Sequence, residues 1–154
     1  MRRLSVASSI FISAALALLT SSADHQRASA QVNDRTPPPG EGVLCAWAIY
    51  AAIATVGQKC HPGEDPEFQS ALGRTIARFD AYVLANSTPS ATPAWIDAFK
   101  RQQGSQDTPT AALCANKDAE NMYQALLKAG ANEIRKSTDE LLARPGNPEW
   151  GTCL

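Results

Sequence analysis

The sequence predicts an all-α fold, a small disulfide-stabilised helical bundle of about four helices packed around a central apolar helix at residues 43–57. Three observations favour this class. One uncharged, alanine-rich stretch is long enough for a helix, apolar residues recur at helical spacing in the segments after it, and no segment alternates apolar and polar residues as a half-buried strand does. The chain also has four cysteines, an even number, which predicts two disulfides that hold the helices together.

The central helix is predicted from the stretch VLCAWAIYAAIATV at residues 43–56. Gly57 follows this stretch, and we expect the helix to end there. The stretch holds no charged residue, and its large side chains include Trp47 and Tyr50. A helix that is apolar on every side must be buried on every side. Because a bilayer span takes about 20 apolar residues, this shorter run is typical of a core helix. We therefore expect the remaining helices to cover it.

The N-terminal region has the pattern of a secretory signal peptide. Two arginines precede an apolar run at residues 4–19, and small residues follow that run. We expect a signal peptide at residues 1–23, cleaved after Ala23, and cleavage after Ala30 is the alternative.

The predicted signal peptide defines the mature chain that we expect and the compartment in which we expect it. Residues 24–42 are polar and proline-rich, which predicts a flexible lead-in, and residues 43–154 are predicted to form a single helical domain. We expect no membrane span after signal cleavage and a periplasmic or secreted location.

The segments after the central helix carry three further helical patterns. Apolar residues spaced by four, four, three and four positions predict a helix at 66–85; they are Phe68, Leu72, Ile76, Phe79 and Val83. Thr-Pro pairs at 92–93 and 108–109 place a capping residue before a proline suited to the first helical turn, so they predict the starts of two more helices. The last helix runs toward Pro145, and a break near Gly130 is left open because glycine weakens a helix.

The cysteines are widely spaced, at Cys45, Cys60, Cys114 and Cys153. Zinc sites built from cysteines usually contain close pairs, so disulfides are the favoured interpretation. Cys45 and Cys60 would lie about 22 Å apart along one helix, too far for a disulfide. Antiparallel packing of neighbouring helices then predicts the pairs Cys60–Cys114 and Cys45–Cys153, and the crossed pairing is the alternative.

The densest polar group in the sequence follows the central helix, with His61, Glu64, Asp65 and Glu67. His61 and Glu64 are the candidate metal ligands, and His61 is a candidate pH-sensitive group. The structural interpretation is favoured, in which Asp65 caps the next helix and His61 lies beside a disulfide. A single histidine in the predicted domain does not make a histidine-based metal site. We therefore expect no metal, no cofactor and no catalytic residue.

Composition and charge narrow the function further. The formal net charge is −1 and the basic residues form no cluster in the sequence, which argues against nucleic acid as a partner. No nucleophile motif or glycine-rich phosphate loop occurs, so an enzyme of unknown class is the third choice. The three tryptophans are expected to fill the core, and the alternative is that they line a ligand pocket.

These exclusions favour an exported non-enzymatic helical binding module. It would act through protein–protein contact, as an inhibitor, immunity protein, adaptor or chaperone does, with another protein as its partner. The alternative is a periplasmic carrier of a small ligand or metal.

Asn86 begins a short Asn-Ser-Thr sequence that matches the N-glycosylation acceptor pattern.

Overall fold

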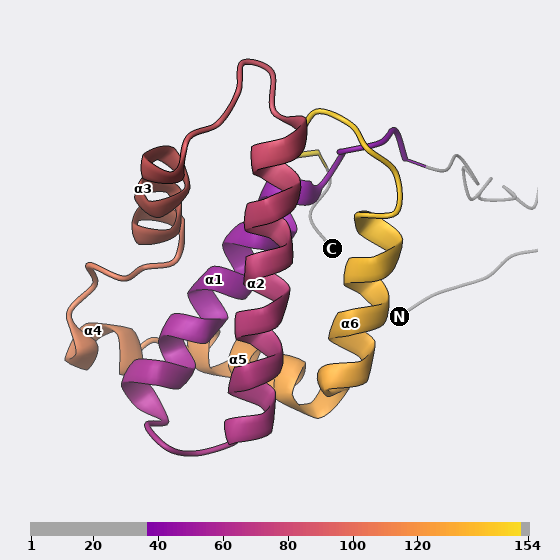
Figure 1. The fold of residues 1–154 in the computed structure, drawn as a ribbon. Helices are drawn as coiled ribbons and strands as arrows, with labels where there is room; N and C mark the ends of the chain where they lie inside the picture. Colours follow the sequence, from indigo (N-terminus) through magenta and orange to yellow (C-terminus); the bar gives the residue numbers. More distant parts are fainter. Residues whose placement is uncertain (1–36, 152–154) are drawn as a thin grey trace, which may run out of the picture. The chain divides into compact units, whose positions relative to one another are not determined.

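The computed structural model describes residues 37–151, and this part of the chain is all-helical, with six helices and no strand (Figure 1). The predicted signal peptide, most of the predicted lead-in and Cys153 lie outside the described residues. In order, the helices are α1 (Val43–Cys60), α2 (Pro66–Asn86), α3 (Pro93–Gln103), α4 (Thr110–Cys114), α5 (Lys117–Ala129) and α6 (Ala131–Leu141).

Helix α1 is the core of this structure, as its uncharged sequence predicts. It packs against α2, α3, α4 and α5, and Val43, Trp47 and Ile53 on it are fully buried. By length and composition alone, α1 is also long and apolar enough to cross a membrane. Here most of its side chains are covered by the other helices, and the core helix of a globular protein needs the same composition.

The prediction that α1 ends at Gly57 is wrong, because the helix continues to Cys60. Gly57 is a buried position within the helix, and a Cβ atom built there would lie 1.7 Å from the Gln69 side-chain nitrogen on α2. The glycine therefore makes room for a side chain of the neighbouring helix.

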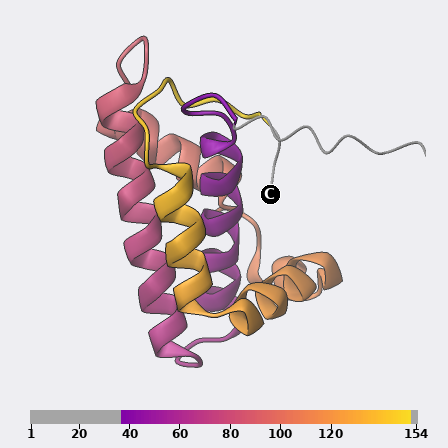
Figure 2. The same ribbon diagram turned by 90° about the vertical axis from the view of Figure 1, so that its right-hand side faces the viewer.

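Helix α2 lies along α1, and α6 lies along α2, so that the three helices run side by side (Figure 2). Four of the five apolar positions predicted for α2 are buried and Ile76 is partly buried, which confirms the helical spacing. Asp65 precedes the helix, but it does not cap it as predicted. Its backbone is left-handed, with φ of 49°, and its side chain makes no capping hydrogen bond.

Helix α3 begins as the Thr-Pro pair predicts. The Thr92 hydroxyl accepts a hydrogen bond from the Trp95 backbone N–H at 3.2 Å, and Pro93 occupies the first turn. The Lys100 ammonium donates to the Asp80 carboxylate at 2.7 Å, which links α3 to α2.

The predicted last helix is divided into α4, α5 and α6, so the described residues contain six helices instead of about four. The first break lies at Asn116, whose side-chain oxygen accepts hydrogen bonds from the backbone N–H groups of Asp118 and Ala119 and starts α5. The second lies at Gly130, where the sequence left a break open, and φ is 85° there. The turn at Gly130 lets α6 return along α2.

The predicted Cys60–Cys114 disulfide is present and joins the ends of α1 and α4, with the two Cα atoms 5.4 Å apart. The predicted Cys45–Cys153 pair involves a residue outside the described part of the chain and stays a prediction.

The segment before α1 is held against the segment after α6. The Glu149 N–H donates to the Gly40 carbonyl at 2.9 Å, and the Leu44 N–H donates to the Glu149 carbonyl at 3.2 Å. The Tyr82 hydroxyl on α2 bonds the carbonyls of Arg144 and Gly146 at 2.9 and 3.1 Å. These bonds hold the backbone of the segment that carries Trp150.

Candidate functional site

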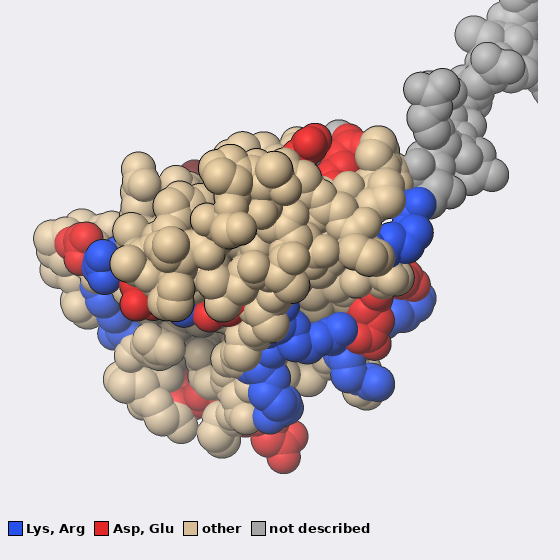
Figure 3. Space-filling view, turned by 45° about the horizontal axis from the view of Figure 1, so that its top comes forward, with Lys and Arg blue, Asp and Glu red and all other residues tan. Residues whose placement is uncertain are grey.

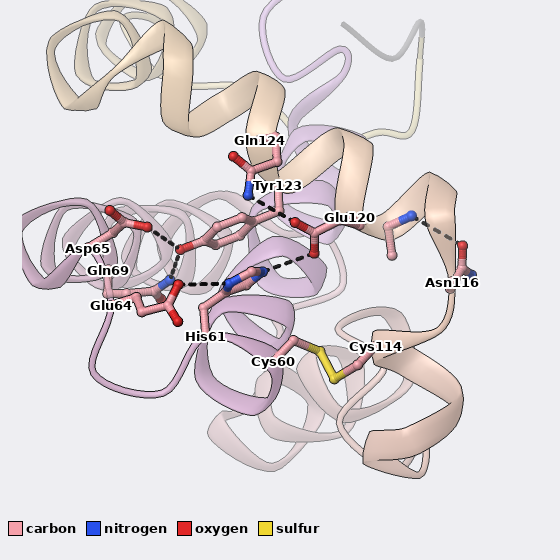
Figure 4. Close-up of polar contacts among 11 residues, drawn as sticks. Cys60, His61, Glu64, Asp65, Gln69, Cys114, Asn116, Glu120, Tyr123 and Gln124 are labelled. Atoms are coloured by element: carbon pink, nitrogen blue, oxygen red, sulfur yellow. Dashed lines mark hydrogen bonds and ion pairs between the residues drawn. A yellow bond between two sulfur atoms is a disulfide. The ribbon is translucent and has the colours of Figure 1, made fainter.

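Two regions hold the residues that the sequence singled out, and the first is the corner between α1 and α2, residues 61–65. His61 follows Cys60 there, and its ring contacts two carboxylates (Figure 4). Its Nδ1 lies 3.1 Å from Glu64 Oε2 on the same corner, and its Nε2 lies 2.9 Å from Glu120 Oε2 on α5. The His61 side chain is only 17% exposed.

This geometry favours the charged form of His61, because only an imidazolium can donate hydrogen bonds from both ring nitrogens. The hydrogen bond to Glu120 raises the pKa of His61 most, Glu64 raises it further, and partial burial opposes the rise. The pKa of Glu120 is lowered by its hydrogen bond from Gln124, at 2.9 Å, and by His61. The corner is therefore tied to α5 by a charged pair.

Tyr123 on α5 contacts His61 and links it to two further polar side chains. Its ring stacks on His61 with centroids 4.5 Å apart and planes within 7°. Its hydroxyl donates to Asp65 Oδ2 at 3.2 Å and accepts from Gln69 Nε2 at 3.1 Å (Figure 4). Burial raises the pKa of the Tyr123 hydroxyl. Asp65 thus bonds a side chain from another helix instead of capping α2.

The predicted metal candidates His61 and Glu64 are brought together here, but both ring nitrogens already contact carboxylates. Neither nitrogen presents a free lone pair to a metal or to a proton donor in this arrangement. Among residues 37–151, no group of three or more His, Cys, Asp and Glu side chains is placed to hold a metal ion. The raised pKa of His61 follows first from its hydrogen bond to Glu120, and the lowered pKa of Glu120 follows first from its hydrogen bond from Gln124 and then from His61. Both causes are structural.

The second region is an aromatic surface formed by Leu44, Trp95 and Trp150 around the buried ring of Phe99. Phe99 is its centre, with ring centroids 5.3 Å from Trp95 and 5.8 Å from Trp150. Trp47 on α1 stacks under Phe99 at 4.2 Å. Trp47 fills the core as expected, whereas Trp95 and Trp150 are 43% and 48% exposed and do not. The core interpretation is therefore wrong for two of the three tryptophans.

Two grooves adjoin on this surface, since Leu44 and Trp95 line both. The larger has a volume of about 340 Å³ and lies against the loop 87–92, and the smaller, of about 230 Å³, lies against α3. No residue that lines either groove is charged. Figure 3 shows a broad uncharged area on the end of the molecule where the α2–α3 loop lies, with charged side chains at its edges.

The walls of the larger groove are held by hydrogen bonds. The Thr88 N–H donates to the Asn147 side-chain oxygen at 2.8 Å, which joins the α2–α3 loop to the segment after α6. The Ser87 hydroxyl donates to the Val83 carbonyl at 2.7 Å. Below the surface, the buried indole nitrogen of Trp47 has no hydrogen-bond partner within the described chain. The groove is thus formed by segments that the fold fixes in place.

Sequence reasoning missed two features of these sites. Glu120 lies 59 residues from His61, and it is an ordinary acidic residue in a helical pattern, so nothing in the sequence marks their contact. The loop 87–92 is an uncharged Ser, Thr, Pro and Ala stretch, and that composition is the signal that predicts an uncharged wall. Comparison with protein-family models, with curated proteins and with solved structures finds no match for this chain.

Proposed function

We propose that this protein is an exported non-enzymatic helical binding module that acts through contact with another protein, and that the aromatic surface makes this contact. The observation that carries the proposal is the exposure of Trp95 and Trp150 beside two grooves without a charged lining residue. An inhibitor, an immunity protein, an adaptor and a chaperone would each use such a surface.

The chemistry of the surface supports a protein partner with an uncharged, apolar contact region. Tryptophan is enriched among the residues that contribute most to protein–protein binding, and charged residues are depleted at the centre of interfaces. A charged group of the partner would lose its hydration in these grooves and would meet no opposite charge there, so its binding would be unfavourable. The partner is therefore expected to insert apolar side chains beside Trp95 and Trp150.

Export is supported by the disulfide and by the pattern at the N-terminus. The Cys60–Cys114 bridge is typical of proteins from an oxidising compartment such as the periplasm or the extracellular space. The predicted signal peptide gives the same expectation from an independent part of the chain.

A second candidate function is transport of a small apolar ligand, and the groove of about 340 Å³ favours it. This volume lies within the range of about 300–1,000 Å³ that is usual for small-molecule sites. Trp95 would then stack on the ligand, while Asn147 and the serine and threonine side chains of the loop would offer hydrogen bonds.

The experiment that separates these functions is affinity capture from the exported fraction of the native host, followed by native mass spectrometry. Wild-type protein, Trp95→Ala, Trp150→Ala and Leu84→Ala are compared. Leu84 on α2 is 41% exposed and lines neither groove, so it controls for the loss of any exposed apolar side chain. Binding at the aromatic surface predicts one polypeptide retained by wild type and Leu84→Ala and lost from both tryptophan variants.

Two results would contradict the protein-contact proposal. Retention of the same polypeptide by the tryptophan variants would move the contact to another surface. A small molecule that copurifies with wild type, and is lost from Trp95→Ala, would favour the carrier function.

A further inference from the structure

A cleft between α2 and α6 brings two arginines of α2 together with one arginine of α6. Arg74 and Arg78 come from α2, and Arg135 comes from α6. We call this the arginine cleft; its volume is about 240 Å³. Small residues also line it, namely Ala71, Thr75 and Ala131. It shares no lining residue with the grooves of the aromatic surface.

The positive charge in the arginine cleft is only partly neutralised. Arg78 pairs with Asp139 at 2.7 Å. The other two guanidiniums donate to neutral oxygens: Arg74 to the Ser70 hydroxyl at 2.6 Å, and Arg135 to the Asn132 amide oxygen at 3.4 Å. Within residues 37–151, Arg74 and Arg135 have no carboxylate partner, so the three arginines and Asp139 leave about two unbalanced positive charges.

The three arginines are solvent-exposed, and they lie close enough to act on one bound group. Arg74 and Arg78 are four residues apart on one helix, where like charges repel. The turn at Gly130 then brings α6 back along α2 and adds Arg135 to the same cleft. Figure 3 shows basic side chains below the uncharged area, with acidic side chains among them, over the part of the molecule where α2 and α6 lie in Figure 1. An anion bound between the guanidiniums would relieve this repulsion.

The chemistry of the cleft matches a phosphate group. A guanidinium presents planar, paired N–H donors that fit two oxygens of a phosphate or carboxylate. A phosphate monoester carries a charge of about −1.5 to −2 at neutral pH, which balances the two unpaired arginines, whereas one carboxylate would balance only one. The small residues beside the arginines leave room for a tetrahedral group.

We propose that the arginine cleft is a binding site for a phosphate group, held by Arg74 and Arg135 from opposite sides and by Arg78 where it is not engaged by Asp139. The site is separate from the aromatic surface and does not depend on the function proposed for that surface.

The test is a titration of the purified full chain with inorganic phosphate, at constant ionic strength maintained with chloride, followed by amide chemical shifts. Wild type, Arg74→Gln, Arg135→Gln and Arg101→Gln are compared. Arg101 is an exposed arginine on α3 outside the cleft, so its variant removes the same charge elsewhere. The proposal predicts saturable binding of one phosphate, weakened about fivefold or more by each cleft variant and less than twofold by Arg101→Gln.

Arg135→Lys provides a second variant, because it keeps the charge and removes the paired donors. It is expected to weaken phosphate binding less than Arg135→Gln and to fold as wild type does. Shifts that do not saturate, or a loss of affinity in Arg101→Gln as large as in the cleft variants, would overturn the proposal.

Vesicle sedimentation distinguishes a lipid headgroup from a soluble phosphate compound as the source of the phosphate group. Phosphatidylcholine vesicles with and without phosphatidic acid are sedimented with each variant. Cosedimentation that requires phosphatidic acid and is reduced by Arg74→Gln and Arg135→Gln assigns the site to a lipid headgroup. Phosphate binding without such cosedimentation assigns it to a soluble phosphate compound. Failure to bind either probe would overturn the proposal.

Discussion

The ion pairs of His61 contribute to the stability of the fold. It lies between a carboxylate of its own corner, Glu64, and one from α5, Glu120, and its ring stacks on the buried Tyr123. Glu120 is 36% exposed and Glu64 is 65% exposed, so the bond to Glu120 is less screened by solvent. The charged state of His61 therefore affects the contact between α1 and α5 more than the conformation of the corner.

This pairing predicts a pH dependence of stability. The pKa of His61 is raised in the folded state, so its contribution is fully present below its ordinary pKa of 6.5 and is lost as the pH rises through the folded pKa. The pKa of Glu120 is lowered, so its contribution is present above its ordinary pKa of 4.5 and is lost as the pH falls through the folded pKa. The pair stabilises the fold most between these ordinary values.

The measurement is the free energy of unfolding from urea titrations at pH 5.5 and pH 8, for wild type, His61→Gln and Glu120→Gln. Each substitution is expected to cost more at pH 5.5 than at pH 8, because the charged pair is complete only at the lower value. Glu64→Gln is the milder comparison, since Glu64 is more exposed. Equal costs at both pH values would show that His61 is not held in its charged form.

At the scale of elements, the fold combines one buried helix with connections that side chains fix. Several elements follow from the sequence: the uncharged stretch of α1, the apolar spacing of α2 and the Thr-Pro start of α3 all act locally, through burial, periodicity and capping. The sequence leaves a break at Gly130 open. The break at Asn116 does not follow from the helical spacing, which continues through it; asparagine favours an N-cap over a helix interior, and its side chain caps α5 here. The contact between His61 and Glu120 depends on that break.

The contact between the segment before α1 and the segment after α6 gives a prediction for glycine substitutions. Gly40 has φ of 88°, and a Cβ atom there would lie 2.1 Å from the Asn147 carbonyl oxygen. Gly63 has a similar φ of 81°, but a Cβ atom there would meet no atom within 4 Å. Gly63→Ala is expected to cost about 1 kcal/mol from the backbone conformation alone. Gly40→Ala is expected to cost clearly more, because the backbone of the other segment must also move.

Urea unfolding of the two glycine variants measures this difference. The far-UV circular dichroism of the whole protein should be unchanged in both variants under native conditions. Equal destabilisation by Gly40→Ala and Gly63→Ala would show that the two segments are not held as closely as the structure places them.

At the scale of the whole molecule, the Cys60–Cys114 disulfide closes a large part of the described chain. Cys60 and Cys114 are separated by 54 positions, and the loop between them contains α2 and α3. Closing a loop of this length stabilises a protein by about 4 kcal/mol in the chain-entropy model. The bridge also joins the end of α4 to the end of α1, directly beside the His61 corner. Stability of the corner and of the core are therefore linked.

Replacing both cysteines, as Cys60→Ser with Cys114→Ser, is expected to destabilise the fold by about 4 kcal/mol. The melting temperature and the free energy of unfolding measure this loss, and the metal content of wild type and variant is compared in parallel. A stability close to that of wild type would contradict the stabilising role of the bridge. Loss of a bound metal on substitution would instead indicate that these cysteines act as ligands.

The central claim is that the aromatic surface contacts a protein partner, and site-specific photo-crosslinking tests it most directly. A photoreactive residue is placed at Ser90, in the wall of the larger groove, or at Leu84 as the control, and the protein is irradiated in the exported fraction of its host. The proposal predicts one discrete protein adduct from position 90, which excess unlabelled wild type suppresses and excess Trp95→Ala does not. No adduct at position 90 beyond the level at position 84 would contradict it.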